Sequence, residues 1–206
     1  MVTGLPAVAS APSDPVLIRT FAVEDAEQVH KVFADGMMAY PEHVDGGVLA
    51  PFVKNYISSA IADDLNPEGG MKKTFLEGSS SFWCAVDQRK DSPTHGRIIG
   101  IVGGQALDTD PYKTCPEPVM ELRRMAVHAG ARGLGVASAL VKTLEDHARA
   151  RGICRVVLST GTVMIAAQRL YERCGYVEGR IELFEEPEFN LSKADNVGFV
   201  VLSKLL

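Results

Sequence analysis

The sequence lacks an excess of basic residues, a close pair of cysteines and a long apolar run. Its 21 lysines and arginines stand against 26 aspartates and glutamates, so the formal net charge is −5. This balance argues against nucleic acid or an anionic membrane as the main partner. No stretch approaches the ~18 apolar residues that span a bilayer. The four cysteines lack the CxxC spacing of zinc and dithiol redox sites: Cys84, Cys115, Cys154 and Cys174.

The N-terminal residues lack the basic start of a signal or transit peptide, because the first basic residue is Arg19. Residues 1–14 are rich in Ala, Pro and Ser and predict a flexible tail. The chain is 46% hydrophobic and 23% charged, as globular domains are, so we expect one domain over residues 15–206. Widely spaced cysteines are typical of reduced thiols, and together these features predict a cytoplasmic protein.

Hydrophobic patterning predicts a change of organisation along the chain. The first half reads as strands joined by polar turns, with helices that begin at residue 23 and cover 51–64. Antiparallel strands followed by a βαβ unit and further strands indicate one mixed α+β domain. The expected strands cover residues 16–21, 81–86, 97–102, 119–127, 154–159, 176–184 and 197–202.

The most informative segment is a glycine-rich turn between the strand at 119–127 and the next helix. Gly133 and Gly135 have no Cβ atom, so backbone N–H groups can approach a phosphate closely. Amides at a helix N-terminus form an anion site together with the helix dipole, and Arg132 adds a positive charge. No acidic residue occurs from Arg132 to Lys142, which leaves this positive end free for an external anion. The alternative is a plain glycine turn that lets a helix pack near a strand.

Two familiar phosphate-binding motifs do not fit this turn. The GxxxxGK[ST] pattern of P-loops is absent. The dinucleotide-binding pattern GxGxxG is only approximated by residues 133–138, and the acid expected about twenty residues later is missing. The missing acid argues against a dinucleotide oxidoreductase.

The turn instead resembles the R/Q-x-x-G-x-G/A signature of the GCN5-related N-acetyltransferase (GNAT) superfamily, in the form Arg132-Gly-Leu-Gly-Val-Ala137. The strand at 121–127 precedes it at the usual distance, and residues 167–176 resemble the family's AxxLYxxxGF motif. One departure is Met164, where the family often has Asn. Within the superfamily the chain loosely resembles the N-acetyltransferase 8 type, although it lacks the membrane-embedding apolar stretch of that type.

The resemblance implies a single GNAT-like α+β domain. A mixed, mostly antiparallel central sheet would carry helices on both faces and a central βαβ site for acyl-CoA. The co-substrate would be acetyl-CoA, and no metal is implied. The pantetheine arm would pair with the main chain of Met125, Ala126 and Val127. The pyrophosphate would bind the amides of Arg132, Gly133, Leu134, Gly135, Val136, Ala137 and Ser138.

The resemblance also implies two residues that move protons. Tyr171 matches the family tyrosine that reaches the CoA sulfur, and its alternative role is an aromatic on a buried helix face. Glu121 matches the glutamate that deprotonates the acceptor amine through water in histone-modifying relatives, and its alternative role is an ion pair with Arg123. Strand alternation would place Glu121, Arg123, Met125 and Val127 on one face. It would also place Arg123 and Arg124 on opposite faces, with at least one of them facing a site or a charge partner.

The function implied is direct acetyl transfer from acetyl-CoA to a primary amine on a small molecule or peptide. The alternative is a non-catalytic module that binds acyl-CoA. A homodimer is possible, and the amine itself has no readable motif. We expect the connection at 36–51 and the loop at 185–196 to frame the acceptor cleft. That loop is acidic, because it contains Glu185, Glu186 and Glu188. Its charge is equally consistent with a cationic acceptor amine and with a loop that is simply exposed to solvent.

Overall fold

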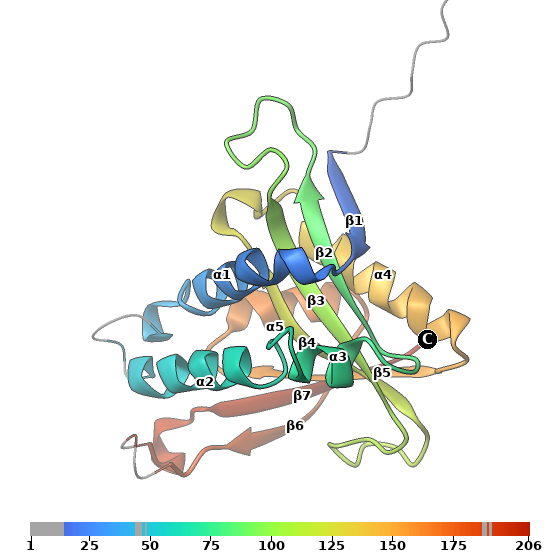
Figure 1. Cartoon of the computed structure of the whole chain (residues 1–206). Coiled ribbons are helices and arrows are strands. Elements are labelled where there is room, and N and C mark those ends of the chain that lie inside the picture. The colour runs from blue at the N-terminus through green and yellow to red at the C-terminus, as the bar shows by residue number, and fades with distance from the viewer. Residues whose placement is uncertain (1–14, 44–46, 48, 187–188, 190) are drawn as a thin grey trace, which may run out of the picture.

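The computed structural model describes residues 15–43, 47, 49–186, 189 and 191–206, so the tail expected at 1–14 lies outside the described residues. The described chain forms a single α+β domain (Figure 1). Its strands are β1 (Val16–Thr20), β2 (Ser81–Asp87), β3 (Ile98–Leu107), β4 (Val119–Val127), β5 (Arg155–Gly161), β6 (Val177–Leu183) and β7 (Gly198–Leu205). Its helices are α1 (Ala26–Met37), α2 (Ala50–Ala62), α3 (Gly70–Phe75), α4 (Val136–Ala150) and α5 (Ile165–Arg173).

The strands form one seven-stranded sheet in the order β1-β2-β3-β4-β5-β7-β6. Neighbouring strands are antiparallel, except that β4 and β5 run parallel because α4 connects them. The sheet is therefore mixed and mostly antiparallel, with a central βαβ unit, which confirms the predicted fold class.

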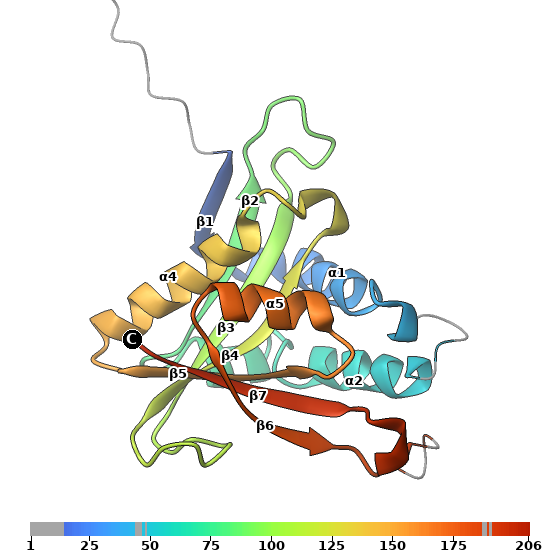
Figure 2. The same ribbon diagram turned by 180° about the vertical axis from the view of Figure 1, so that it is seen from behind.

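Helices cover both faces of the sheet, as predicted. Helices α1, α2 and α3 lie on the face seen in Figure 1, and α4 and α5 lie on the other face, seen in Figure 2. Each layer has its own core. Phe33, Ile57 and Phe75 pack over one face, whereas Leu140 and Leu144 of α4 pack over the other.

Glycines let the helices approach the central strands. A Cβ atom on Gly36 of α1 would lie 2.8 Å from the Cβ of Ala126 on β4. A Cβ atom on Gly100 of β3 would lie 2.9 Å from Val136 Cγ1 at the start of α4. These contacts bring the end of α1 and the beginning of α4 to opposite faces of the same part of β4.

Strands β4 and β5 pair over a short distance only. The parallel register contains two pairs, Met120 with Val156 and Glu121 with Val157. Beyond Glu121 the two strands diverge, and β4 changes its pleat at a bulge. There the register with β3 shifts between Ile101 and Gly103, and Arg124 has a φ of 52°. At the centre of the sheet, β4 therefore separates from β5 and bulges away from its regular pairing with β3.

Several elements differ from the sequence-based expectation. Helix α3 has no counterpart among the expected elements, and β3, β5 and β7 continue to Leu107, Gly161 and Leu205 rather than ending at residues 102, 159 and 202. Gly103 lies in the extension of β3, and a Cβ atom there would lie 2.5 Å from Phe75 Cε1 of α3. Glycine suits this position of the strand because a helix packs directly against the backbone there. Within the described residues, no helix combines the length and the apolar character needed to cross a membrane.

Candidate active site

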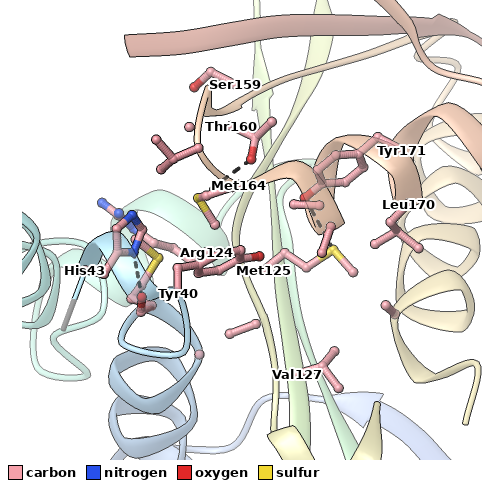
Figure 3. Close-up of a pocket in the computed structure, with 18 of the residues that line it drawn as sticks. Tyr40, His43, Arg124, Met125, Val127, Ser159, Thr160, Met164, Leu170 and Tyr171 are labelled. Carbon is pink, nitrogen blue, oxygen red and sulfur yellow. Dashed lines mark hydrogen bonds between the residues drawn. The ribbon is translucent and has the colours of Figure 1, made fainter. Parts of the chain in front are cut away.

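A cleft of about 580 Å³ opens where β4 and β5 diverge (Figure 3). It runs from the glycine-rich turn, past the bulge of β4, to the ends of α1 and α2. Helix α5 and strand β7 supply the remaining walls. Elements from both faces of the sheet therefore line one cleft where the two parallel strands diverge.

The glycine-rich turn supplies one end of the cleft. Gly133 and Gly135 have φ values of 79° and 76°, a left-handed conformation that glycine adopts without strain. Gly135 is the N-cap of α4 and provides no side-chain cap, so the first amides of the helix lack an intrahelical acceptor. Leu134 is exposed and does not line the cleft. The residues of the turn that do line it are Arg132, Gly133, Gly135, Val136, Ala137 and Ser138.

Strand β4 supplies the floor of the cleft through Met125, Ala126 and Val127, which all line it. Strand β5 pairs with β4 only as far as Glu121. The β5-facing edge of residues 125–127 is therefore available to an extended ligand that adds to the sheet. These are the three residues that the sequence assigned to the pantetheine arm.

The bulge overturns the predicted alternation along β4. Arg123 and Arg124 lie on the same face, because both contact Asp64 between α2 and α3. Met125 and Val127 pack against the core beneath α4, on the other face. The predicted common face for Glu121, Arg123, Met125 and Val127 is therefore wrong, and so is the predicted separation of the two arginines. Because Arg124 adopts a left-handed backbone conformation, the side chains that follow it on β4 point to the face opposite the one that simple alternation predicts.

The charge partner of the two arginines is Asp64. Arg124 Nε donates to Asp64 Oδ1 at 2.9 Å and its Nη2 donates to Oδ2 at 3.0 Å. Arg123 Nη2 lies 2.9 Å from Asp64 Oδ2. The Arg124 guanidinium also hydrogen-bonds the Tyr56 hydroxyl and lies over the Phe33 and Tyr56 rings, 5.5 and 5.0 Å from their centroids. Arg124 lines the cleft, so its charge is held in place at the cleft wall.

Tyr171 of α5 reaches the cleft opposite the bulge. Its side chain is 6% exposed, and its hydroxyl donates to Met125 Sδ at 3.6 Å (Figure 3). Burial raises the pKa of Tyr171 above its ordinary value, and the neighbouring Tyr40 and Cys174 raise it further. The hydroxyl therefore keeps its proton at neutral pH. Tyr176 is buried and packs edge-to-face on Tyr171.

Glu121 is not among the described residues that line the cleft. Its Oε1 accepts a hydrogen bond from the Tyr112 hydroxyl at 2.6 Å, and that hydroxyl lies 3.0 Å from Ser159 Oγ. Ser159 does line the cleft, so two hydroxyls connect Glu121 to it. The predicted alternative, a pair with Arg123, is not what the structure has, because Arg123 donates to Gln105 and contacts Asp64.

Sequence reasoning missed the far wall of the cleft. Tyr40 and His43 lie across Met125 from Tyr171 (Figure 3). His43 is 3% exposed, and its Nδ1 donates to the Met37 carbonyl at 2.6 Å. No motif marks these residues. The aromatic side chains Phe52, Phe184 and Phe199 complete this wall.

The connection expected at 36–51 frames the cleft through residues such as Tyr40, His43 and Leu49, whereas no described residue of the loop at 185–196 lines it; only the flanking Phe184 and Val197 do. The acidic loop does not line it. Glu185 pairs with Lys193 at 3.1 Å, and Glu186 forms a backbone bridge with Leu191. Glu188 lies outside the described residues. The charged residues in the described lining are arginines, namely Arg124, Arg132 and Arg173, and that lining includes no aspartate or glutamate.

The family model described as the acetyltransferase (GNAT) family matches residues 55–176, more than half of the 206-residue chain. The chain therefore belongs to the GNAT acetyltransferase family. Human N-acetyltransferase 8 is 32% identical over 122 residues, which cover 59% of this chain and 48% of the relative. The N-acetylaspartate synthetase of Danio rerio is 33% identical over 151 residues, which cover 72% of this chain and 48% of the relative. The chain spans about half the length of these curated relatives.

Solved structures share the fold at low sequence identity. The PaiA N-acetyltransferase of Thermoplasma acidophilum, in complex with coenzyme A, has a TM-score of 0.62 and 14% identity, covering 93% of this chain and 99% of that one. NAA60 of Arabidopsis thaliana, in complex with a bisubstrate analogue, has a TM-score of 0.61 and 16% identity, covering 92% and 97%. The similarity to the N-acetyltransferase 8 type that the sequence predicted is confirmed.

Proposed function

We propose that this protein is an acetyl-CoA-dependent N-acetyltransferase that moves the acetyl group directly to a primary amine. One observation carries the proposal: the uncapped N-terminus of α4, the free edge of β4 and the Tyr171 hydroxyl all border one cleft. An anion site, a strand edge and a proton donor are the three features that binding and cleaving an acyl-CoA thioester require. A module that only binds acyl-CoA has no need of the third.

The turn fits the pyrophosphate of acetyl-CoA. Ala137 and Ser138 follow the N-cap Gly135 in the first turn of α4, where backbone amides are free, and Arg132 supplies a positive charge beside them. No side chain fills the space above Gly133 or Gly135, since a Cβ atom on either would meet no atom within 4 Å. The pantetheine arm would then follow residues 125–127 toward Tyr171.

The chemistry needs a neutral amine, attack on the thioester carbonyl and a proton for the departing thiolate. The amine forms the new C–N bond as the C–S bond breaks. Tyr171 supplies the proton to the sulfur, since its hydroxyl is protonated at neutral pH and borders the cleft beside Met125. The ammonium first gives a proton to Glu121, which leaves a free amine. After the C–N bond has formed, the nitrogen loses a second proton, which returns to Tyr171 through water.

The lining of the acceptor side favours an apolar amine that carries a carboxylate. Phe52, Phe184 and Phe199 offer an aromatic surface, and Arg124 offers a fixed cation. Arg123 and Arg124 share the single carboxylate of Asp64, so this cluster keeps one net positive charge, and the described lining holds no acid to offset its repulsion of a second positive charge brought by a polyamine. At an effective dielectric constant of 20, that repulsion costs about 2–3 kcal/mol at ~6–8 Å. The curated relatives named N-acetylaspartate synthetases act by name on an amino acid, which supports the same class.

An acceptor screen tests the proposal. Phenylalanine, phenylalaninamide, aspartate and spermidine would each be incubated with acetyl-CoA, and the acetylated product measured by mass spectrometry. We expect product from phenylalanine, with a kcat/KM at least about tenfold above that of spermidine, the ratio given by 1.4 kcal/mol. Phenylalaninamide lacks the carboxylate of phenylalanine, so the ratio of the two kcat/KM values measures the contribution of that carboxylate. If acetyl-CoA stabilises the protein but no amine is acetylated, the chain is a binding module.

A further inference from the structure

A chain of three side chains leads from the cleft to Glu121. Ser159 Oγ lies 3.0 Å from the Tyr112 hydroxyl, and that hydroxyl lies 2.6 Å from Glu121 Oε1. We propose that Ser159 and Tyr112 relay the proton of the acceptor ammonium to Glu121. This inference rests on the proposed N-acetyltransferase function. It also explains how Glu121 can act as the base although it does not line the cleft.

The direction of the chain follows from the number of protons available. A tyrosine hydroxyl has one proton to donate, and a carboxylate can only accept. The Tyr112 hydroxyl is placed to donate either to Glu121 Oε1 or to Ser159 Oγ. Its one proton goes to the carboxylate, which is the stronger acceptor, and the relay then requires the Ser159 hydroxyl to turn its own proton toward the phenol oxygen. In that arrangement a lone pair on Ser159 Oγ remains for a donor in the cleft, and the hydrogen bonds run in the order that proton transfer to Glu121 requires.

The fold holds Tyr112 firmly in this place. Tyr112 belongs to the connection between β3 and β4, where the buried Asp110 accepts from three backbone amides. These are Tyr112 N at 2.8 Å, Thr114 N at 2.6 Å and Cys115 N at 3.1 Å. Glu121 and Ser159 lie on the neighbouring strands β4 and β5 at the end of their paired region. The phenol thus bridges the two strands where they begin to diverge.

The surrounding charges keep Tyr112 protonated. Burial raises its pKa above the ordinary value, and Glu121 raises it further, while Ser159 and the Arg123 guanidinium lower it by less. Arg123 and Arg124, the two cations near Glu121, share the single carboxylate of Asp64. Tyr112 therefore passes a proton on without ionising at neutral pH. The groups that face the relay are Glu121, Arg123, Arg124 and Asp64.

The transfer balances. The ammonium N–H bond breaks as Ser159 Oγ gains that proton, Ser159 gives its own proton to Tyr112, and Tyr112 gives its proton to Glu121. Afterwards both hydroxyls are unchanged, Glu121 is neutral and the amine holds a free electron pair. Glu121 later releases the proton to water. No oxidant, reductant or further reactant is needed.

Tyr112→Phe and Ser159→Ala test the relay, with Tyr176→Phe as the matched control. Tyr176 is buried, its hydroxyl does not line the cleft, and it is not part of the relay. We expect Tyr112→Phe to lower kcat/KM at neutral pH about 10²-fold, within the range of general base catalysis. The loss should shrink as the pH approaches the pKa of the amine itself, because free amine then needs no base. The stabilisation of the protein by acetyl-CoA should stay at the parent level.

Combining variants separates a relay from a structural brace. If the residues act as a unit, Tyr112→Phe with Glu121→Gln should be no slower than Glu121→Gln alone. A purely structural Tyr112 would lower the rate by the same factor at every pH, and that result would overturn the relay. The relay would also be overturned if His43→Gln lost the rate at neutral pH while Tyr112→Phe retained it. An inactive parent would overturn the proposed function and the relay together, whereas an active parent with an unaffected Tyr112→Phe overturns the relay alone.

Discussion

Asp64→Asn should strongly destabilise the protein, because it removes the charge that compensates two arginines. Arg124 and Asp64 are both 9% exposed at their side chains, and Arg123 is 30% exposed. Asn keeps the volume and one acceptor oxygen, but its amide nitrogen is a donor and would face a guanidinium where the second carboxylate oxygen now accepts. Breaking a buried pair by removing one partner costs about 3–5 kcal/mol. Domains of this kind are stable by only about 5–15 kcal/mol, so the variant should lose about a fifth of its stability or more.

Urea unfolding followed by circular dichroism would measure this loss. The matched control is Asp146→Asn, which removes the carboxylate that pairs with Lys142 and Arg149 on the surface of α4, where the Asp146, Lys142 and Arg149 side chains are 51%, 74% and 45% exposed. Exposed helix pairs contribute about 0.3–0.5 kcal/mol, so the control should be nearly neutral. If the two variants unfold at the same urea concentration, the reasoning about the buried arginine network is refuted.

Three further predictions follow from the environments of single residues. Tyr171→Phe should lower kcat about 10²-fold with little change in acetyl-CoA affinity; full turnover would restrict Tyr171 to a packing role. Arg89, Ser92 and Thr94 hold the pKa of buried Asp87 well below its usual range. That stabilisation is present above the unfolded pKa near ~4 and is lost as the pH falls toward the folded value. The stability gap between the parent and Asp87→Asn, from urea unfolding at several pH values, should therefore narrow with acid. Burial raises the pKa of Cys84 to about 12, whereas Cys154 is exposed. A maleimide should therefore modify Cys154 in the folded protein and Cys84 only after unfolding. Labelling of both cysteines at equal rates would contradict the fold.

The glycine turn and the helices around it could be predicted because their signals are local. Gly133 and Gly135 mark a backbone that needs positive φ, and Val136, Leu140 and Leu144 repeat at the spacing of one buried helix face. Strand β4 has the predicted bounds for the same reason. Each of these signals lies within a dozen residues, so no tertiary contact is needed to read it.

The bulge and the relay could not be predicted because they depend on distant contacts. Arg124 adopts a φ of 52°, which the sequence does not mark with a glycine or an asparagine. Asp64, sixty residues earlier, is its hydrogen-bond partner. Tyr112 lies forty-seven residues before Ser159 in an irregular connection. A single hydrogen bond between such segments leaves no periodic pattern in the sequence.

Calorimetric titration of acetyl-CoA into the parent and Ala137→Asp tests the central claim most directly. A substitution at Gly135 would strain the backbone, since its φ is 76°, whereas Ala137 lies in the first turn of α4 and lines the cleft. An aspartate there suits the helix dipole, so the unliganded protein should stay stable while its charge repels the pyrophosphate. We predict saturable binding to the parent, at least about tenfold weaker binding to Ala137→Asp, and parent-like binding to Ala137→Asn, the uncharged control. Equal affinity in all three proteins would contradict an acetyl-CoA site at this turn.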